Sequence, residues 1–186
     1  MKSLDRGFMA WAERTSIALR KELNLSVDDR LCPFALAGYL GIKVWTPNDV
    51  PEITNDVLKS LNSDQWGWSA TSFEAGGNSI IIHNPNHSKG RQASNIMHEI
   101  SHNILSHNPS IILTIELENT CMRSFNQKQE DEANCLGWSL LLPREGLLRS
   151  KFKKHADDEI ANHFGVTTKL VSFRTQTTGI SRQIRY

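Results

Sequence analysis

Hydrophobic and polar residues are arranged along this chain in patterns that predict helices towards both ends and a β-rich stretch between them. We expect a helix over about residues 7–23 and a short one over about 33–40. Short apolar runs predict a strand at 42–45 and two further strands, 67–73 and 79–83, which form a hairpin around a Gly-Gly turn. This order of elements predicts an α+β fold with a small antiparallel sheet.

The helix that we expect after this hairpin has one apolar side and one polar side. Its apolar side, which should face the core, is formed by Ile96, Met97, Ile100 and Ile104. Its polar side carries His98, Glu99 and His102 in the pattern H-E-x-x-H. Histidines that merely fill a core would be expected within the apolar stripe, so their position on the polar side favours a functional site.

The spacing of H-E-x-x-H suits a metal site built on one helix. Residues four apart are offset by about 40° around a helix axis, so His98 and His102 can grip a single ion. Glu99 lies beside them, where a carboxylate can take a proton from a metal-activated water. The same pattern can arise by chance, so the prediction of hydrolytic metal chemistry depends on a third ligand.

The third ligand must come from another part of the chain. His107 does not fit, because a continuing helix would turn it about 180° from His98, and we expect it at the helix end or beside a ligand. A second helical run begins near Glu130 and stops at Pro143. We take Glu130 as the ligand and Glu132 as the alternative.

The neighbours of Glu130 have other expected roles. Asn134, four residues further along, should orient one of the ligating imidazoles. For Asp131 and Glu132, the simplest interpretation is a solvated acidic first turn, which the helix dipole favours.

Two blocks of sequence carry a family resemblance. One is Arg91 followed by H-E-I-S-H-N-I-L-S-H at 98–107, and the other is E-D-E-A-N-C-L-G-W-S-L-L-L-P at 130–143. Two further segments agree: 33–44 and 79–84. Together they resemble the ImmA/IrrE family of bacterial and phage metallo-endopeptidases, over most of residues 10–175.

The resemblance implies a zincin-like, gluzincin-type core and a zinc-dependent endopeptidase. Zn²⁺ would be held by His98, His102 and Glu130 with water in the fourth position, although two His and one carboxylate also suit Mn²⁺ or Fe²⁺. Glu99 would deprotonate the attacking water. The implied substrates are helix-turn-helix transcriptional repressors, whose cleavage derepresses mobile-element or stress genes. Three residues are candidates to stabilise the oxyanion: Arg91, His155 and His163.

The last part of the chain has the outline of a helix-turn-helix. Residues 157–164 and 167–175 predict two short helices joined at Gly165, and Thr167 can cap the second. Four cations make this part of the chain basic: Lys169, Arg174, Arg182 and Arg185. They could contact DNA phosphates, but we favour a helical hairpin that packs against the catalytic part.

Composition narrows the class of protein. With 186 residues, 39% of them hydrophobic, and a net charge of +1, we expect a core of ordinary size and no polyanionic partner. No segment predicts a membrane span or a secretory signal, and three cysteines without a C-x-x-C motif suit a reducing cytosol, so we expect a cytoplasmic protein.

Other features of the chain leave alternatives open. We expect residues 1–150 to form a zincin-like domain and 151–186 a helix-turn-helix-like subdomain with a basic tail.

An extended substrate could add to an edge strand, for which 79–83 is our candidate, although an internal core strand fits equally. Residues 108–129 predict either a strand or a substrate-shaping loop. The alternative function is a DNA-binding or protein-binding regulator with a structural or vestigial metal site.

Overall fold

The computed structural model describes residues 3–51, 53–63, 67–107, 112–115, 120–123 and 126–184. The helices among them are α1 (Phe8–Glu22), α2 (Pro33–Tyr39), α3 (Asn55–Ser63), α4 (Lys89–Ile104), α5 (Gln127–Leu141), α6 (Arg144–Phe152), α7 (Asp157–Phe164), α8 (Thr168–Thr177) and α9 (Ile180–Gln183), with a 3₁₀ turn η1 (Pro47–Asp49). The strands are β1 (Lys43–Trp45), β2 (Ala70–Ala75), β3 (Asn78–His83), β4 (Ile112–Ile115) and β5 (Thr120–Arg123). These elements make an α+β fold, as predicted.

The three-stranded sheet is mixed rather than antiparallel, and this corrects the prediction. Its order is β1-β3-β2, with β1 parallel to β3 and β2 antiparallel to it. Strand β3 is therefore central, so the choice of 79–83 as the edge strand is wrong and β2 lies at the edge of this sheet. Ile80 and Ile81 point to opposite faces of the sheet and both are buried, so β3 is covered on both faces, as its unbroken apolar run indicates.

The β2–β3 hairpin closes through two glycines. Ala75 pairs with Asn78, so only Gly76 and Gly77 remain in the loop. Both have positive φ angles, 57° and 74°, which the twist of a two-residue hairpin requires and which glycine adopts without steric cost. The strands therefore extend further into the turn than the sequence pattern predicted.

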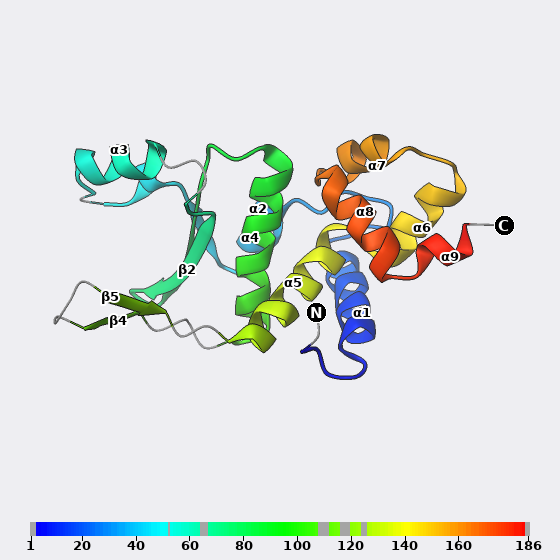
Figure 1. The fold of residues 1–186 in the computed structure, drawn as a ribbon, viewed down its shortest axis with the longest axis horizontal. Coiled ribbons are helices and arrows are strands. Elements are labelled where there is room, and N and C mark those ends of the chain that lie inside the picture. Colours follow the sequence, from blue (N-terminus) through cyan, green and yellow to red (C-terminus); the bar gives the residue numbers. More distant parts are fainter. Residues whose placement is uncertain are drawn as a thin grey trace.

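Helix α4 lies at the centre of the molecule, between β2 on one side and α5 and α1 on the other (Figure 1). The predicted apolar side of α4 faces the core, where Ile96, Met97 and Ile100 are fully buried. Leu136 and Leu140 of α5 belong to the same buried cluster. Burial of each such side chain contributes about 1.5–3 kcal/mol, so this packing sets how α5 lies against α4.

Helices α4 and α5 approach each other closely at Gly137. A Cβ atom at this position would lie 3.2 Å from the Ser101 hydroxyl oxygen and 3.3 Å from the Met97 carbonyl oxygen. A larger residue would force the two helices apart, because the backbone of α4 cannot yield as a flexible side chain does. Glycine therefore permits the close approach on which the site between these helices depends.

Buried side chains hold the carboxyl end of α5. Ser16 donates a 2.7 Å hydrogen bond to the Ser139 carbonyl, and Arg20 donates one of 2.8 Å to the Leu140 carbonyl. Burial lowers the pKa of Arg20 to about 10, and the guanidinium also donates to two carbonyls of the loop after α1. These donors satisfy carbonyl groups in the last turn of the helix, which have no backbone donor within the helix.

The predicted helix-turn-helix is present as α7 and α8. Gly165 makes the turn with a φ of 69°, and the Thr167 side chain caps α8 by accepting from the Leu170 amide. Arg174, however, is only 2% exposed, so it is not available for the phosphate contacts of the less favoured alternative. Lys169 and Arg182 are exposed, whereas Arg185 lies outside the described residues.

The remaining expectations concern the middle of the chain and its division. Within segment 108–129, for which a strand or a loop was left open, β4 and β5 pair as antiparallel strands, and residues 108–111, 116–119 and 124–125 lie outside the described residues. The division at residue 150 stays a prediction. No helix in the described part of the chain is both long enough and apolar enough to span a membrane.

Candidate metal centre

The two histidines of H-E-x-x-H point the same way from α4. Their Nε2 atoms lie 3.0 Å apart, and both rings are partly buried. This is the result of the four-residue spacing on a regular helix, which stacks the two side chains on one face.

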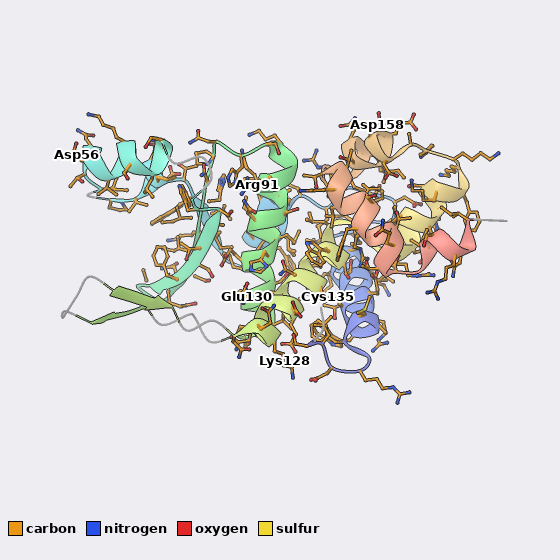
Figure 2. The ribbon with its side chains drawn as sticks, viewed as in Figure 1. Asp56, Arg91, Lys128, Glu130, Cys135 and Asp158 are labelled. Carbon is orange, nitrogen blue, oxygen red and sulfur yellow. The ribbon has the colours of Figure 1, made fainter. Side chains whose placement is uncertain are left out.

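Glu130 joins these histidines from the first turn of α5. Its carboxylate oxygens lie 3.2 Å from Nε2 of His98 and 3.5 Å from Nε2 of His102. Figure 2 shows Glu130 on the part of α5 that passes α4. Asn126 accepts hydrogen bonds from the amides of Lys128 and Gln129, and this cap begins the helix in the register that turns Glu130 towards α4.

The three side chains fit a single metal ion. Bonds of about 2.0–2.1 Å in tetrahedral geometry hold the donor atoms of zinc ligands roughly 3.3 Å apart. The observed separations of 3.0, 3.2 and 3.5 Å are close to this value. His98, His102 and Glu130 form a group of possible metal ligands whose donor atoms all lie within 4.8 Å of one another.

The consecutive acidic residues of α5 point in different directions, because each residue turns by about 100° around a helix. Glu130 faces the histidines, as described above. Asp131 accepts a 2.7 Å hydrogen bond from the Ser3 hydroxyl, which lowers the pKa of its carboxyl to about 2. Glu132 lies 3.1 Å from Nε2 of His107. The expected solvated turn is therefore wrong for Asp131 and Glu132, and Glu132 lies outside the group of possible ligands.

Each imidazole has a partner on its other nitrogen. Nδ1 of His98 lies 3.1 Å from the side-chain oxygen of Asn134, in agreement with the orienting role expected of Asn134. Nδ1 of His102 lies 2.9 Å from Nδ1 of His107. His107 therefore lies behind a candidate ligand, one of the two positions expected for it. Such partners fix the orientation of a ligating ring.

Glu99 has a partner that the sequence analysis missed. Ser72 of β2 donates a 2.6 Å hydrogen bond to Oε2 of Glu99, and Glu99 is 9% exposed. Ser72 is partly buried, whereas Thr71 and Phe73 on either side of it are exposed. A polar residue on the inward side of a two-residue alternation was the available signal, but it identifies a partner only after the strand is placed beside α4.

These residues line a cleft of about 800 Å³ between β2, α4 and α5. No lysine or arginine is among the described residues that line it, whereas Glu74, Glu99 and Glu130 are. One part of the wall is Trp138, which packs edge-to-face against Phe173 of α8 with ring centroids 4.6 Å apart. The cleft is therefore acidic near the candidate ligands and has an aromatic wall.

The oxyanion candidates fall in different places. His155 and His163 line a separate depression with Asp28, so neither reaches the cleft and both are wrong as candidates. Arg91 is not among the residues that line the cleft either, although its guanidinium lies 3.5 Å from the hydroxyl of Ser69, which does line it. A role for Arg91 at the oxyanion stays a prediction.

No curated protein matches the chain. A solved structure of a Mycobacterium tuberculosis transcriptional regulator is similar, with 14% identity and a TM-score of 0.48, over 90% of this chain and 46% of that one. The chain thus spans about half the length of that regulator, at 46%.

The family comparison covers the site itself. Residues 52–176 match the Peptidase_M78 family, described as the IrrE N-terminal-like domain. The matched range contains α4 and α5, and it confirms the resemblance inferred from the two sequence blocks. Since the match extends over more than half of the chain, this protein belongs to the Peptidase_M78 family of IrrE N-terminal-like domains.

Proposed function

We propose that this protein is a zinc-dependent endopeptidase with a zincin-like core. The observation that carries the proposal is the convergence of His98, His102 and Glu130 beside Glu99, in a cleft of a chain that belongs to a peptidase family. Two imidazoles and one carboxylate also suit Mn²⁺ or Fe²⁺, and zinc is the metal that the family resemblance implies.

The chain's own residues supply the proton transfers. A divalent ion held at this site provides Lewis acidity, which activates water and polarises a carbonyl group. Glu99 accepts the proton of the attacking water and then passes it to the leaving amine. The Ser72 hydroxyl holds Oε2 of Glu99, so the carboxylate is oriented before substrate arrives.

The substrate backbone is proposed to bind along β2. Strand β2 pairs with β3 on one side, and residues 69–74 line the cleft. An extended segment can therefore pair with its outer edge and lie across the metal site. A helical segment cannot form these backbone hydrogen bonds, so the cleaved segment is an extended linker or a locally unfolded part of the substrate.

The proposed substrate is a helix-turn-helix transcriptional repressor, as the family resemblance implies. Cleavage would derepress the mobile-element or stress genes that the repressor controls. Because such repressors act on chromosomal or phage DNA, the proposed place of action is the cytoplasm.

The alternative is a DNA-binding or protein-binding regulator with a structural or vestigial metal site. It is supported by α7 and α8, where Lys169 lies exposed near the start of the second helix. It is weakened by Arg174, because this buried guanidinium donates hydrogen bonds to the Leu142 carbonyl and to Glu13 and is not available to DNA. The peptidase is therefore the function that the geometry supports better.

The deciding experiment compares wild type with Glu99→Gln on candidate repressors, with zinc supplied and products identified by mass spectrometry. Loss of the general base should slow cleavage roughly 100- to 10,000-fold. Zinc content and folding should stay unchanged, since Glu99 is not among the proposed ligands. Glu145→Gln is the matched control, because Glu145 lies exposed on α6, and it should cleave like wild type. If wild type leaves every candidate repressor intact, the peptidase proposal is lost.

A further inference from the structure

Behind His102 the structure holds a chain of titratable side chains that the proposed mechanism does not use. Helix α4 ends at Ile104, and Ser106 adopts a positive φ of 50°, which turns the backbone back. The His107 amide then donates a 3.0 Å hydrogen bond to the His102 carbonyl. This turn brings the His107 ring against the His102 ring, with ring centroids 5.0 Å apart at an angle of 68°.

The hydrogen-bond pattern has only one arrangement that suits metal binding. Nε2 of His102 faces Glu130 and His98, so ligation requires its lone pair there and its proton on Nδ1. That proton can be donated to Nδ1 of His107, 2.9 Å away. His107 must then carry its own proton on Nε2, 3.1 Å from the carboxylate of Glu132.

Glu132 selects this arrangement over the opposite one. If His107 donated from Nδ1 instead, its Nε2 would present a lone pair to the carboxylate, and His102 would carry its proton on the nitrogen that faces the metal site. Two acceptors at 3.1 Å repel each other, whereas an N–H donor facing a carboxylate makes a charge-assisted hydrogen bond. The carboxylate therefore sets the proton position on His107, which sets the proton position on His102.

The chain of contacts is sheltered and held at its far end. The side chain of His107 is 8% exposed and that of Glu132 is 14% exposed. Lys128 lies 3.8 Å from the other carboxylate oxygen of Glu132 and 2.7 Å from Asp5. Figure 2 shows Lys128 at the start of α5, below Glu130. His98, in contrast, is backed by the neutral amide of Asn134, so the two candidate ligands differ in their support.

We infer that His107 and Glu132 form a relay of positioning residues, which holds His102 in the tautomer and orientation that bind the metal through Nε2. The inference rests on the proposed metal site and deepens it. Partners behind ligating histidines typically change metal affinity about 10- to 100-fold. His107 is thus assigned a role in metal binding without being a ligand.

The first test measures zinc affinity of the full chain by competition with a chromophoric chelator. His107→Ala and Glu132→Ala should each weaken zinc binding about 10- to 100-fold. Because the relay is serial, the double variant should be no weaker than His107→Ala alone. His107→Gln should recover part of the affinity, since its amide can accept from His102 and donate to Glu132. His155→Ala, which removes an exposed histidine outside the cleft, should bind zinc like wild type.

The second test reads the proton position directly. Nitrogen-15 NMR of the zinc-loaded protein should show His102 protonated at Nδ1, with a coupling across the hydrogen bond to Nδ1 of His107, and His107 protonated at Nε2. A merely structural role for His107 would produce neither the coupling nor a fixed proton on Nε2. The inference is overturned if His107 is protonated at Nδ1 in the zinc-loaded wild type, or if His107→Ala binds zinc as tightly as wild type.

Both readouts are independent of peptide cleavage. If wild type binds zinc and the relay variants weaken it, yet no repressor is cleaved, the endopeptidase proposal fails and the relay stands. If cleavage is observed and zinc affinity is insensitive to His107, the relay fails and the endopeptidase stands. If wild type binds no zinc, both are overturned.

Discussion

Replacing Arg174 with leucine should destabilise the protein substantially, because this arginine is buried. Its guanidinium donates hydrogen bonds of 3.2 and 3.0 Å to the Leu142 carbonyl, just after α5, and forms an ion pair with Glu13. An orphaned buried acceptor costs about 1–3 kcal/mol, and breaking a buried ion pair costs about 3–5 kcal/mol. Glu13 is 20% exposed and also accepts from the amide of Arg144 and the hydroxyl of Ser139, which reduces the second cost. The expected total is therefore about 3 kcal/mol.

Urea denaturation measures this loss as a lower midpoint at an unchanged slope. Arg182→Leu is the matched control, since Arg182 is exposed and its replacement should change stability by no more than about 0.5 kcal/mol. In a double-mutant cycle, Glu13→Gln should lose much of its effect once Arg174 has been replaced. The reasoning is refuted if Arg174→Leu costs less than about 1 kcal/mol. A mild cost together with loss of DNA binding would instead support the alternative in which Arg174 contacts phosphates.

Three further predictions concern burial and close packing. Burial lowers the pKa of His83 below its usual 6.5, so protonation of His83 favours the unfolded chain. The free energy of unfolding should therefore be highest above about pH 6.5 and decrease as the pH falls below it, and it should decrease less steeply in His83→Gln. The same pH dependence in wild type and His83→Gln would contradict this. Burial raises the pKa of the Cys135 thiol to about 11, so iodoacetamide at about pH 7.5 should label exposed Cys32 and leave Cys135 unlabelled. Peptide mapping measures the labelling, and equal labelling of both cysteines in the folded protein would contradict the prediction. Gly137→Leu should lower the free energy of unfolding, measured by urea denaturation, by about 1–3 kcal/mol, and it should weaken zinc binding because it moves α5 away from α4. Gly38→Leu is the control and should do neither, because no atom lies within 4 Å of a Cβ at that position.

The elements that sequence patterns predicted well are those with strong local signals. Helix α4 has a regular apolar stripe, the β2–β3 hairpin has two adjacent glycines, and α8 has Thr167 as its cap. Each signal depends on residues within one or two turns of each other, so it can be read without knowledge of the rest of the fold.

Three helices and one strand position were missed. Helix α3 has a clear apolar stripe that was overlooked, although none of its residues is buried, whereas α6 has a weak stripe and α9 has only four residues. The sheet was predicted as antiparallel because sequence neighbours commonly pair. The parallel pairing of β1 with β3 joins residues far apart in the chain, which local patterns do not report.

By itself, the sequence determined the chemistry that α4 presents. A four-residue spacing on a helix places His98 and His102 on one face whatever surrounds the helix, and Glu99 follows from the same geometry. Local spacing alone did not decide whether Glu130 or Glu132 of α5 is the third candidate ligand.

Only the tertiary structure shows Glu130 rather than Glu132 beside the two histidines, and only it shows Ser72 against Glu99 and Glu132 against His107. Glu130 and Glu132 are about 200° apart around α5, so the choice depends on how α5 is rotated against α4. Core packing and the close approach at Gly137 set that rotation, and they are properties of two helices together. The residues that carry the chemistry are encoded locally, whereas their partners are brought to them by packing between distant parts of the chain.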